Sequence, residues 1–365
     1  MCFIPSVIKS ASRFRYIVVV CNARKEGFMK YFLELKNYWS KIDIDKSKFL
    51  PAGAGAITIN KVKNIAYLYG GLNYKMNLKK YSNKLYKLDL NNESFELIDE
   101  LNIKNRFNHK MFYTKNNKLC ILGGFNNVNE DKPLEYCDEI LLYDISTKKI
   151  ENISISPGLM KRGQFTASMN FEENIVYVFG GFNNSDFFKI DLSNKCIVNL
   201  EPVGDKFNSR AGMISEVLPN GNYFIFSGFN NIDKKSICYN DYYIYNPQKN
   251  EITKNECNEN VGRTFAKSFV YEDLKKIIIF GGSPNGMEGS GSIYFYDYEK
   301  DFFNIAYIQE LPKSRVEPFV IFSKQNKKMY VISGLEPDGK NYNNINEIMV
   351  LDFNKIDNEA WLGHP

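Results

Sequence analysis

The sequence predicts an all-β protein, a six-bladed β-propeller with four antiparallel strands in each blade. Three observations predict this fold. An apolar segment that ends in Gly-Gly or Ser-Gly occurs six times, with its final glycines 47 to 57 residues apart. A second apolar segment that ends in Asp or Asn follows each of them. Aromatic residues make up 15% of the chain, with 28 Phe and 24 Tyr, which favours strands over helices.

The glycine-ended segments are interpreted as the second strand of each blade. A repeat of about fifty residues is typical of units that bury their apolar faces only against a neighbouring unit, and radial closure leaves only short edges. A glycine suits the crowded end of such a strand, where a missing side chain permits close approach or an unusual dihedral angle. The six segments are Ala66–Gly71, Leu119–Gly124, Val176–Gly181, Tyr223–Gly228, Ile277–Gly282 and Met329–Gly334.

The next apolar segment in each repeat is the predicted third strand. Its terminal polar residue is Asp89, Asp144, Asp191, Asn246, Asp297 or Asp352. A ring of such side chains would suit a metal or acid–base site. Their recurrence in one slot of every repeat instead favours a structural role, in which each closes the following turn by accepting backbone hydrogen bonds.

An arginine opens the predicted first strand in five repeats, 18 or 19 residues before the final glycine. These residues are Arg106, Arg162, Arg210, Arg263 and Arg315. The first repeat has no arginine in this slot, which falls near Gly53.

The order of arginine, strand, Gly-Gly, loop and short strand ending in Asp resembles the kelch repeat over roughly residues 38–353. The second repeat is the nearest to the pattern, with Arg106-Phe-Asn-His109 followed by Cys120-Ile-Leu-Gly-Gly124. The chain departs from the family in having only Trp39 and Trp361, so that Phe or Ile takes the other positions where kelch repeats carry Trp.

The resemblance implies a domain organisation. Residues 1–37 are expected to be a partly disordered N-terminal extension, 38–357 the propeller and 358–365 a C-terminal tail. In kelch propellers an N-terminal strand often completes the last blade, and Tyr38–Asp43 is the expected strand here. Asn358–Leu362 is the alternative.

Chain direction places the starts of the first strands and the loops after Gly-Gly on one face. The expected site on this face combines the five arginines with Phe125, Asn126, Phe182, Asn183, Phe229 and Asn230. Guanidinium forks suit carboxylates, and amides both donate and accept. We therefore expect a non-catalytic protein–protein interaction module that binds an acidic peptide or protein. The alternative is that each arginine pairs with a carboxylate of the adjacent blade.

Candidate catalytic residues are few. His109 and His364 are the two histidines, too few for a copper oxidase of this architecture, and no P-loop, GxSxG or HExxH motif is present. No metal or cofactor is expected. The acidic loop Asn129–Glu139 lacks the EF-hand spacing and is interpreted as solvated. A sugar isomerase or mutarotase that acts without a metal, using Glu and Arg at the mouth, remains the alternative function.

Composition sets further limits. Lys and Arg number 47 against 42 Asp and Glu, so that no basic stripe indicates nucleic-acid binding. Seven cysteines without a CxxC pair favour a reducing compartment, the cytoplasm or the nucleus. The apolar run Tyr16–Cys21 is shorter than the roughly 20 residues of a membrane span. We expect a monomeric propeller that does not bind membranes, with a transit segment at the N-terminus left open.

Overall fold

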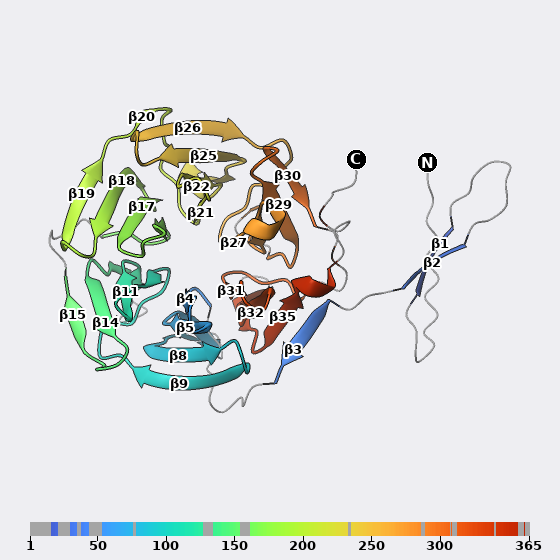
Figure 1. Ribbon diagram of the computed structural model, residues 1–365, viewed down its shortest axis with the longest axis horizontal. Coiled ribbons are helices and arrows are strands. Elements are labelled where there is room, and N and C mark those ends of the chain that lie inside the picture. The colour runs from blue at the N-terminus through green and yellow to red at the C-terminus, as the bar shows by residue number, and fades with distance from the viewer. Residues whose placement is uncertain are drawn as a thin grey trace.

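The computed structural model describes residues 16–20, 30–34, 38–43, 53–75, 78–126, 134–153, 161–232, 235–285, 289–306, 308, 312–338, 341–356 and 361. Six antiparallel sheets form a closed ring around a central axis (Figure 1). This confirms the predicted six-bladed propeller. Within the described residues there is no α-helix, and the helical elements are the 3-10 turns η1 (Glu272–Leu274) and η2 (Phe353–Lys355).

Each blade contains four strands, which follow one another from the axis outward. Blade 1 has β4 (Ala56–Asn60), β5 (Ile65–Tyr69), β8 (Lys84–Asp89) and β9 (Ser94–Glu100); blade 2 has β10 (Lys110–Tyr113), β11 (Lys118–Leu122), β14 (Ile140–Asp144) and β15 (Ile150–Asn152). Blade 3 has β16 (Thr166–Met169), β17 (Ile175–Gly181), β18 (Asn184–Asp191) and β19 (Cys196–Leu200); blade 4 has β21 (Ile214–Val217), β22 (Tyr223–Phe226), β25 (Asp241–Asn246) and β26 (Glu251–Glu256). Blade 5 has β27 (Lys267–Tyr271), β28 (Lys276–Phe280), β29 (Ile293–Asp297) and β30 (Phe302–Ile305); blade 6 has β31 (Phe319–Ser323), β32 (Lys328–Ile332), β35 (Ile348–Asp352) and β3 (Trp39–Ile42).

Shorter strands extend this plan. Blade 4 gains β20 (Val203–Gly204), which pairs in parallel with β26. Four hairpins follow the glycine pairs: β6–β7 (Leu72–Lys75, Leu78–Tyr81), β12–β13 (Phe125–Asn126, Glu135–Tyr136), β23–β24 (Phe229–Ile232, Lys235–Cys238) and β33–β34 (Leu335–Asp338, Asn341–Asn344). Strands β1 (Tyr16–Val20) and β2 (Lys30–Glu34) pair antiparallel with each other.

The sixth blade contains strands from both ends of the propeller sequence. Strand β3 pairs antiparallel with β35, with Trp39 opposite Leu351. The Trp39 side chain is buried, and its ring centroid lies 6.3 Å from that of Phe280 in blade 5. The alternative strand for closing this blade was Asn358–Leu362, and of this segment the structure describes Trp361. The Trp361 side chain is buried and stacks on Phe353, with ring centroids 5.4 Å apart.

The apolar core is divided among the blade interfaces. Six buried clusters each combine residues of two neighbouring blades, and together they run around the ring. Large apolar residues occupy positions where the family has Trp: Phe303 packs against Phe224 of blade 4, and Phe95 stacks on Tyr86. Because every blade buries side chains against two neighbours, closing the ring completes the core.

The six polar residues at the ends of the third strands close turns, as the recurrence in the sequence predicted. In every blade the side-chain oxygen accepts at least one backbone N–H from two or three residues further on, at 2.8–3.2 Å. These side chains are therefore committed to local turns.

Candidate functional site

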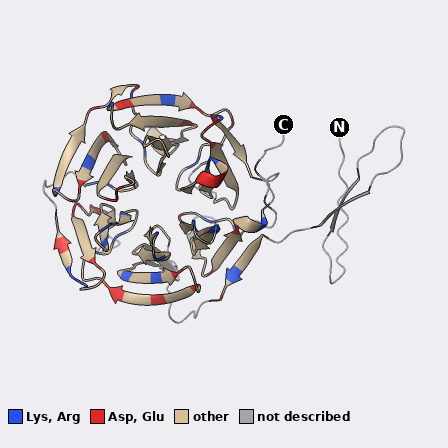
Figure 2. Ribbon diagram, in the orientation of Figure 1, with Lys and Arg blue, Asp and Glu red and all other residues tan. Residues whose placement is uncertain are grey.

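The two faces of the propeller carry different loops. One face, here the Gly-Gly face, carries the starts of the first strands, the glycine pairs and the four hairpins that follow them. The opposite face, here the turn face, carries the turns after the first and third strands. Charged residues of both signs are interspersed around the ring, including its outermost strands (Figure 2).

The five strand-opening arginines lie at the Gly-Gly face, but their side chains are buried. Relative exposure is 0–4% for all five. In each of these five blades, the arginine Nη1 group donates to the carbonyl of the first residue of the glycine pair. The acceptors are Gly123, Gly180, Ser227, Gly281 and Ser333, at 2.9–3.5 Å. This shared contact explains the fixed spacing between arginine and glycine in the sequence.

Four arginines also bind a carboxylate, and it belongs to their own blade rather than to the adjacent one. The pairs are Arg106–Glu139 at 3.4 Å, Arg162–Asp186 at 2.8 Å, Arg210–Asp241 and Arg315–Glu347 at 2.8 Å. In blade 5 the guanidinium of Arg263 instead lies over the ring of Tyr294, 3.5 Å from its centroid. The arginines therefore join the first and third strands of one blade.

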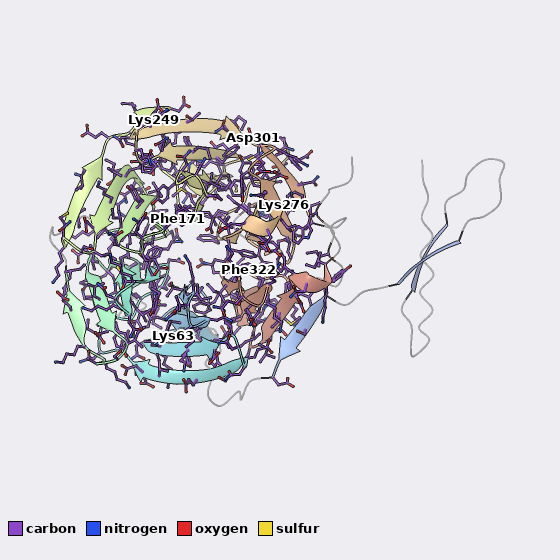
Figure 3. The ribbon with its side chains drawn as sticks, in the orientation of Figure 1. Lys63, Phe171, Lys249, Lys276, Asp301 and Phe322 are labelled. Carbon is purple, nitrogen blue, oxygen red and sulfur yellow. The ribbon has the colours of Figure 1, made fainter. Side chains whose placement is uncertain are left out.

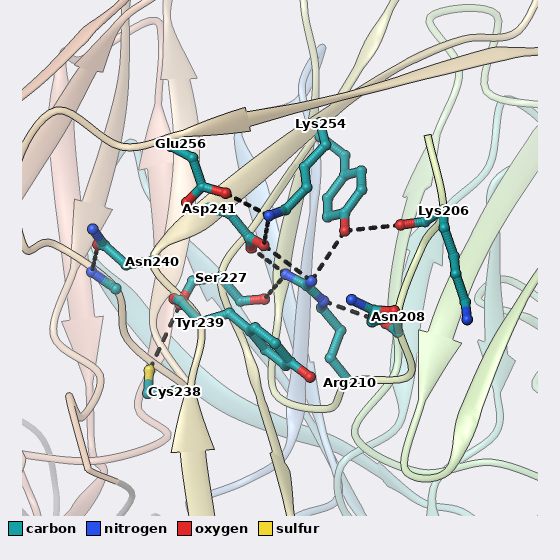
Figure 4. Close-up of polar contacts among 12 residues, drawn as sticks. Lys206, Asn208, Arg210, Ser227, Cys238, Tyr239, Asn240, Asp241, Lys254 and Glu256 are labelled. Carbon is teal, nitrogen blue, oxygen red and sulfur yellow. Dashed lines mark hydrogen bonds and ion pairs between the residues drawn. The ribbon is translucent and has the colours of Figure 1, made fainter. Parts of the chain in front are cut away.

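Arg210 lies in a network of polar and aromatic side chains (Figure 4). Its Nη1 and Nη2 groups both donate to the Asp241 carboxylate, and Nη2 also donates to the Tyr243 hydroxyl at 3.2 Å. The guanidinium lies 3.9 Å from the ring centroid of Tyr239. Lys254 approaches the same carboxylate at 3.4 Å. The network leaves Arg210 no access to a ligand in solution.

Backbone conformation and close contacts explain why the second residue of each pair is glycine. Gly124 has φ 93°, and a Cβ atom at this position would lie 2.6 Å from the Phe107 carbonyl oxygen. The first position is less demanding, because Ser227 and Ser333 occupy it with φ 56° and 53°. Close contact between the second strand and the start of the first strand thus requires glycine once per blade.

The remaining predicted site residues divide by burial. Phe125 and Asn126 are buried, Phe182, Phe229 and Asn230 are half-buried, and Asn183 is exposed. The structure therefore brings the predicted residues to one face as expected, but the arginines, Phe125 and Asn126 serve the packing of that face. The physical reason is that the guanidinium groups find carbonyl and carboxylate acceptors within their own blades.

Exposed positive charge on the Gly-Gly face comes from lysines that the sequence interpretation missed. Lys104, Lys161, Lys206 and Lys313, here the rim lysines, are exposed and precede the arginines of blades 2, 3, 4 and 6. Side chains of Lys104 and Lys313 are 50% and 65% exposed, with ammonium groups 3.8 and 3.5 Å from Glu139 and Glu336. Their signal was a Lys one, two or four residues before the arginine in four of six repeats.

The axis at this face is enclosed by a ring of left-handed backbone. The residues two places after the arginines, and Ala54 in the first repeat, have φ between 51° and 66°. Five of them donate their backbone N–H to the carbonyl of the corresponding residue in the preceding blade, at 2.7–3.4 Å. This left-handed ring consists of Ala54, Asn108, Gln164, Gly212, Phe265 and Glu317.

Behind the left-handed ring, the six innermost strands enclose a channel with a cavity volume of about 510 Å³. Lys110, Lys267 and Glu317 line the lumen where it meets the ring, and Glu216 of β21 lines the channel together with the two lysines. Burial lowers the pKa of Lys110 to about 7, and the nearby Lys267 charge acts in the same direction. Burial raises the pKa of Glu216 to about 7, against the hydrogen bond from Ser268.

These channel residues were not predicted as a site. Lys110 and Lys267 each lie four residues after an arginine, whereas the same slot holds Thr166, Ile214 and Phe319 in other blades. A residue pair that does not recur in all repeats gives little signal. His109, interpreted as structural, is buried beside the channel with its ring centroid 5.3 Å from that of Tyr69. Burial lowers its pKa, so the imidazole is neutral at pH 7.

At the turn face, aromatic side chains and ion pairs border the channel. Phe171 and Phe322 lie beside the central opening (Figure 3), and Phe322 stacks on Phe269 with ring centroids 4.4 Å apart. The Lys61 ammonium lies 3.7 Å from Glu173, which joins the turns of blades 1 and 3. Among the described residues, no group of three or more His, Cys, Asp or Glu is arranged to hold a metal ion.

The fold and this repeated unit define a class. The structure is a six-bladed propeller in which an arginine, a glycine pair and an Asp-closed turn recur from blade to blade. A family model described as the KLHDC2/KLHL20/DRC7 Kelch-repeats domain matches residues 55–282, more than half of the chain. The chain belongs to the kelch-repeat family. No curated protein matches it.

Domains of this family commonly mediate protein interactions and are generally non-catalytic. The part of the chain that the structure describes contains no helix long and apolar enough to cross a membrane.

Proposed function

We propose that this chain is a non-catalytic protein-interaction module that binds an acidic peptide or protein at the Gly-Gly face through the rim lysines. The observation that carries the proposal is the placement of four exposed ammonium groups in equivalent loops of blades 2, 3, 4 and 6. The buried arginines hold those loops in place and do not themselves contact the partner.

The strength expected of this surface follows from its exposure. A solvent-exposed ion pair contributes about 0.2–1 kcal/mol, so a single lysine gives a small effect. Four such contacts sum to roughly 2 kcal/mol, about thirtyfold in affinity. The intramolecular contacts of Lys104 and Lys313 exceed 3.4 Å and are partly exposed, so a ligand carboxylate can replace them.

An array of Asp- and Glu-rich peptides tests this function. A matched array in which Asn and Gln replace the acids is the control for charge. The protein should bind members of the acidic array and not their amide counterparts, and binding should weaken as salt shortens the screening length to about 8 Å at physiological ionic strength. Equal binding to both arrays would refute the acidic specificity.

A second candidate function is supported by a separate observation in the channel. Lys110 and Glu216 both have a pKa of about 7, which suits acid–base chemistry near neutral pH. The corresponding enzyme would be a sugar isomerase or mutarotase that acts without a metal. Following the anomeric equilibration of a panel of reducing sugars by NMR tests it: acceleration that is lost in Glu216→Gln, with the fold intact, would favour the enzyme over the interaction module.

We also propose a reducing compartment, the cytoplasm or the nucleus. Support comes from five described cysteines that are free thiols: Cys120, Cys137, Cys196, Cys238 and Cys257. Imaging of the tagged chain in its native cell tests the location.

A further inference from the structure

Two lysines face the same lumen from opposite sides of the propeller. Lys110 is the first residue of β10 in blade 2, and Lys267 is the first residue of β27 in blade 5. Blades 2 and 5 are opposite in a ring of six. Both side chains line the channel directly behind the left-handed ring. Among the described residues, neither ammonium group has a hydrogen-bond or ion-pair partner within 4 Å.

This arrangement is electrostatically unfavourable when the channel holds only protein groups. Burial lowers the pKa of both lysines, and the charge of Lys267 lowers that of Lys110 as well; Glu317 acts against this shift on both lysines, and Glu216 does so on Lys110. Two half-buried like charges that have no direct ion-pair partner repel each other. A negative group placed between them would remove this repulsion and gain two charge-assisted hydrogen bonds.

The carboxylates in the channel do not fill that role. Glu216 accepts a hydrogen bond from Ser268 at 2.6 Å, and the Asn108 side chain lowers the pKa of Glu317. Burial raises the pKa of both, that of Glu216 to about 7, so Glu216 carries only part of its negative charge near neutral pH. His109, the other ionisable ring nearby, is neutral, and Lys61 acts on Glu216 from the turn face.

We propose that the central channel is a binding site for a small hydroxylated organic anion whose carboxylate or phosphate group lies between Lys110 and Lys267. The cavity of about 510 Å³ falls within the roughly 300–1,000 Å³ of small-molecule sites. Its wall combines apolar side chains such as Phe112 and Phe269 with the hydroxyl groups of Ser168 and Ser215. The site is separate from the rim lysines and does not depend on the proposed peptide binding.

Calorimetric titration of the full chain with three matched probes tests the site. Glycerol 3-phosphate carries a phosphate, glycerate carries a carboxylate, and glycerol carries neither. At least one charged probe should bind with one molecule per chain, and the comparison of the two identifies the preferred anion. Glycerol should not bind. Because Lys110 must be protonated to hold the anion, binding at pH 8 should take up protons, seen as an enthalpy that depends on the buffer.

Variants separate the site from general effects on the fold. Lys110→Met and Lys267→Met should each weaken binding about tenfold or more, the scale of one hydrogen bond to a charged group. Lys63→Met, on an exposed turn outside the cavity lining, should leave affinity unchanged. The melting temperature of each variant shows whether it is folded.

Three results would overturn the proposal: no binding of either charged probe at 10 mM, equal binding of glycerol, or unchanged affinity in folded Lys110→Met and Lys267→Met proteins. The rim-lysine variants should bind the charged probes as the wild type does even if they lose peptide binding, because the probes bind in the channel. The two proposals can therefore fail independently.

Discussion

Replacing Asp241 by Asn should destabilise the protein strongly. The carboxylate is 5% exposed and faces the fully buried Arg210 guanidinium, and it also lies within ion-pair distance of Lys254. The substitution keeps the volume and removes the negative charge, so Arg210 remains buried with only neutral acceptors such as Tyr243 and the Ser227 carbonyl. Breaking a buried ion pair in this way costs about 3–5 kcal/mol.

Urea denaturation and thermal melting measure this cost. At about 2 °C per kcal/mol for a chain of this size, the melting temperature should fall by roughly 6–10 °C. Asp186→Asn is the matched control, because that carboxylate pairs with Arg162 but its side chain is 52% exposed. Water already screens this exposed carboxylate, so its ion pair with Arg162 contributes less than the buried Arg210–Asp241 pair, and the loss should be about 1 kcal/mol. Similar small losses for both variants would refute the structural role assigned to the arginines.

Three further predictions concern the fold and the channel. Gly124→Ala should destabilise the protein by roughly 2–4 kcal/mol in urea titrations, because of backbone strain and the contact of the new Cβ atom with the Phe107 carbonyl. Gly221→Ala is the control and should cost less, because Gly221 also has a positive φ but no atom lies within 4 Å of the new Cβ. Equal losses would contradict this. Deleting residues 1–46 should remove β3 and lower stability by several kcal/mol relative to deleting 1–28, through loss of the buried Trp39; equal melting temperatures would count against closure by this strand. Folding lowers the pKa of Lys110 from 10.5 to about 7, so the free-energy cost of burying its charge is complete below pH 7 and fades as pH rises toward 10.5. Lys110→Met should therefore raise the melting temperature at pH 7 more than at pH 10. A lower melting temperature of the variant at pH 7 would refute the unfavourable environment.

Features that recur in every blade could be predicted from the sequence. The second glycine and the polar residue at the end of the third strand satisfy backbone requirements that recur in all six blades. Their regular spacing therefore predicts the fold. Arg106 and its equivalents were placed on the correct face by chain direction alone.

The burial of the arginines could not be predicted in the same way. Their carboxylate partners vary in type and in distance along the chain, as Asp186 and Glu139 show, lying 24 and 33 residues after Arg162 and Arg106. Lys110 and Lys267 gave no signal because the residue in this slot differs from blade to blade. The two lysines line the same channel because opposite blades face one axis. That arrangement exists only once the ring has closed.

The measurement that tests the central claim most directly pairs affinity with stability. Wild-type protein and a variant with Gln at positions 104, 161, 206 and 313 are titrated with the tightest acidic peptide from the array, and both are melted. The account predicts roughly thirtyfold weaker binding with a melting temperature within about 2 °C of wild type. Unchanged affinity in that folded variant would contradict binding at the Gly-Gly face through the rim lysines.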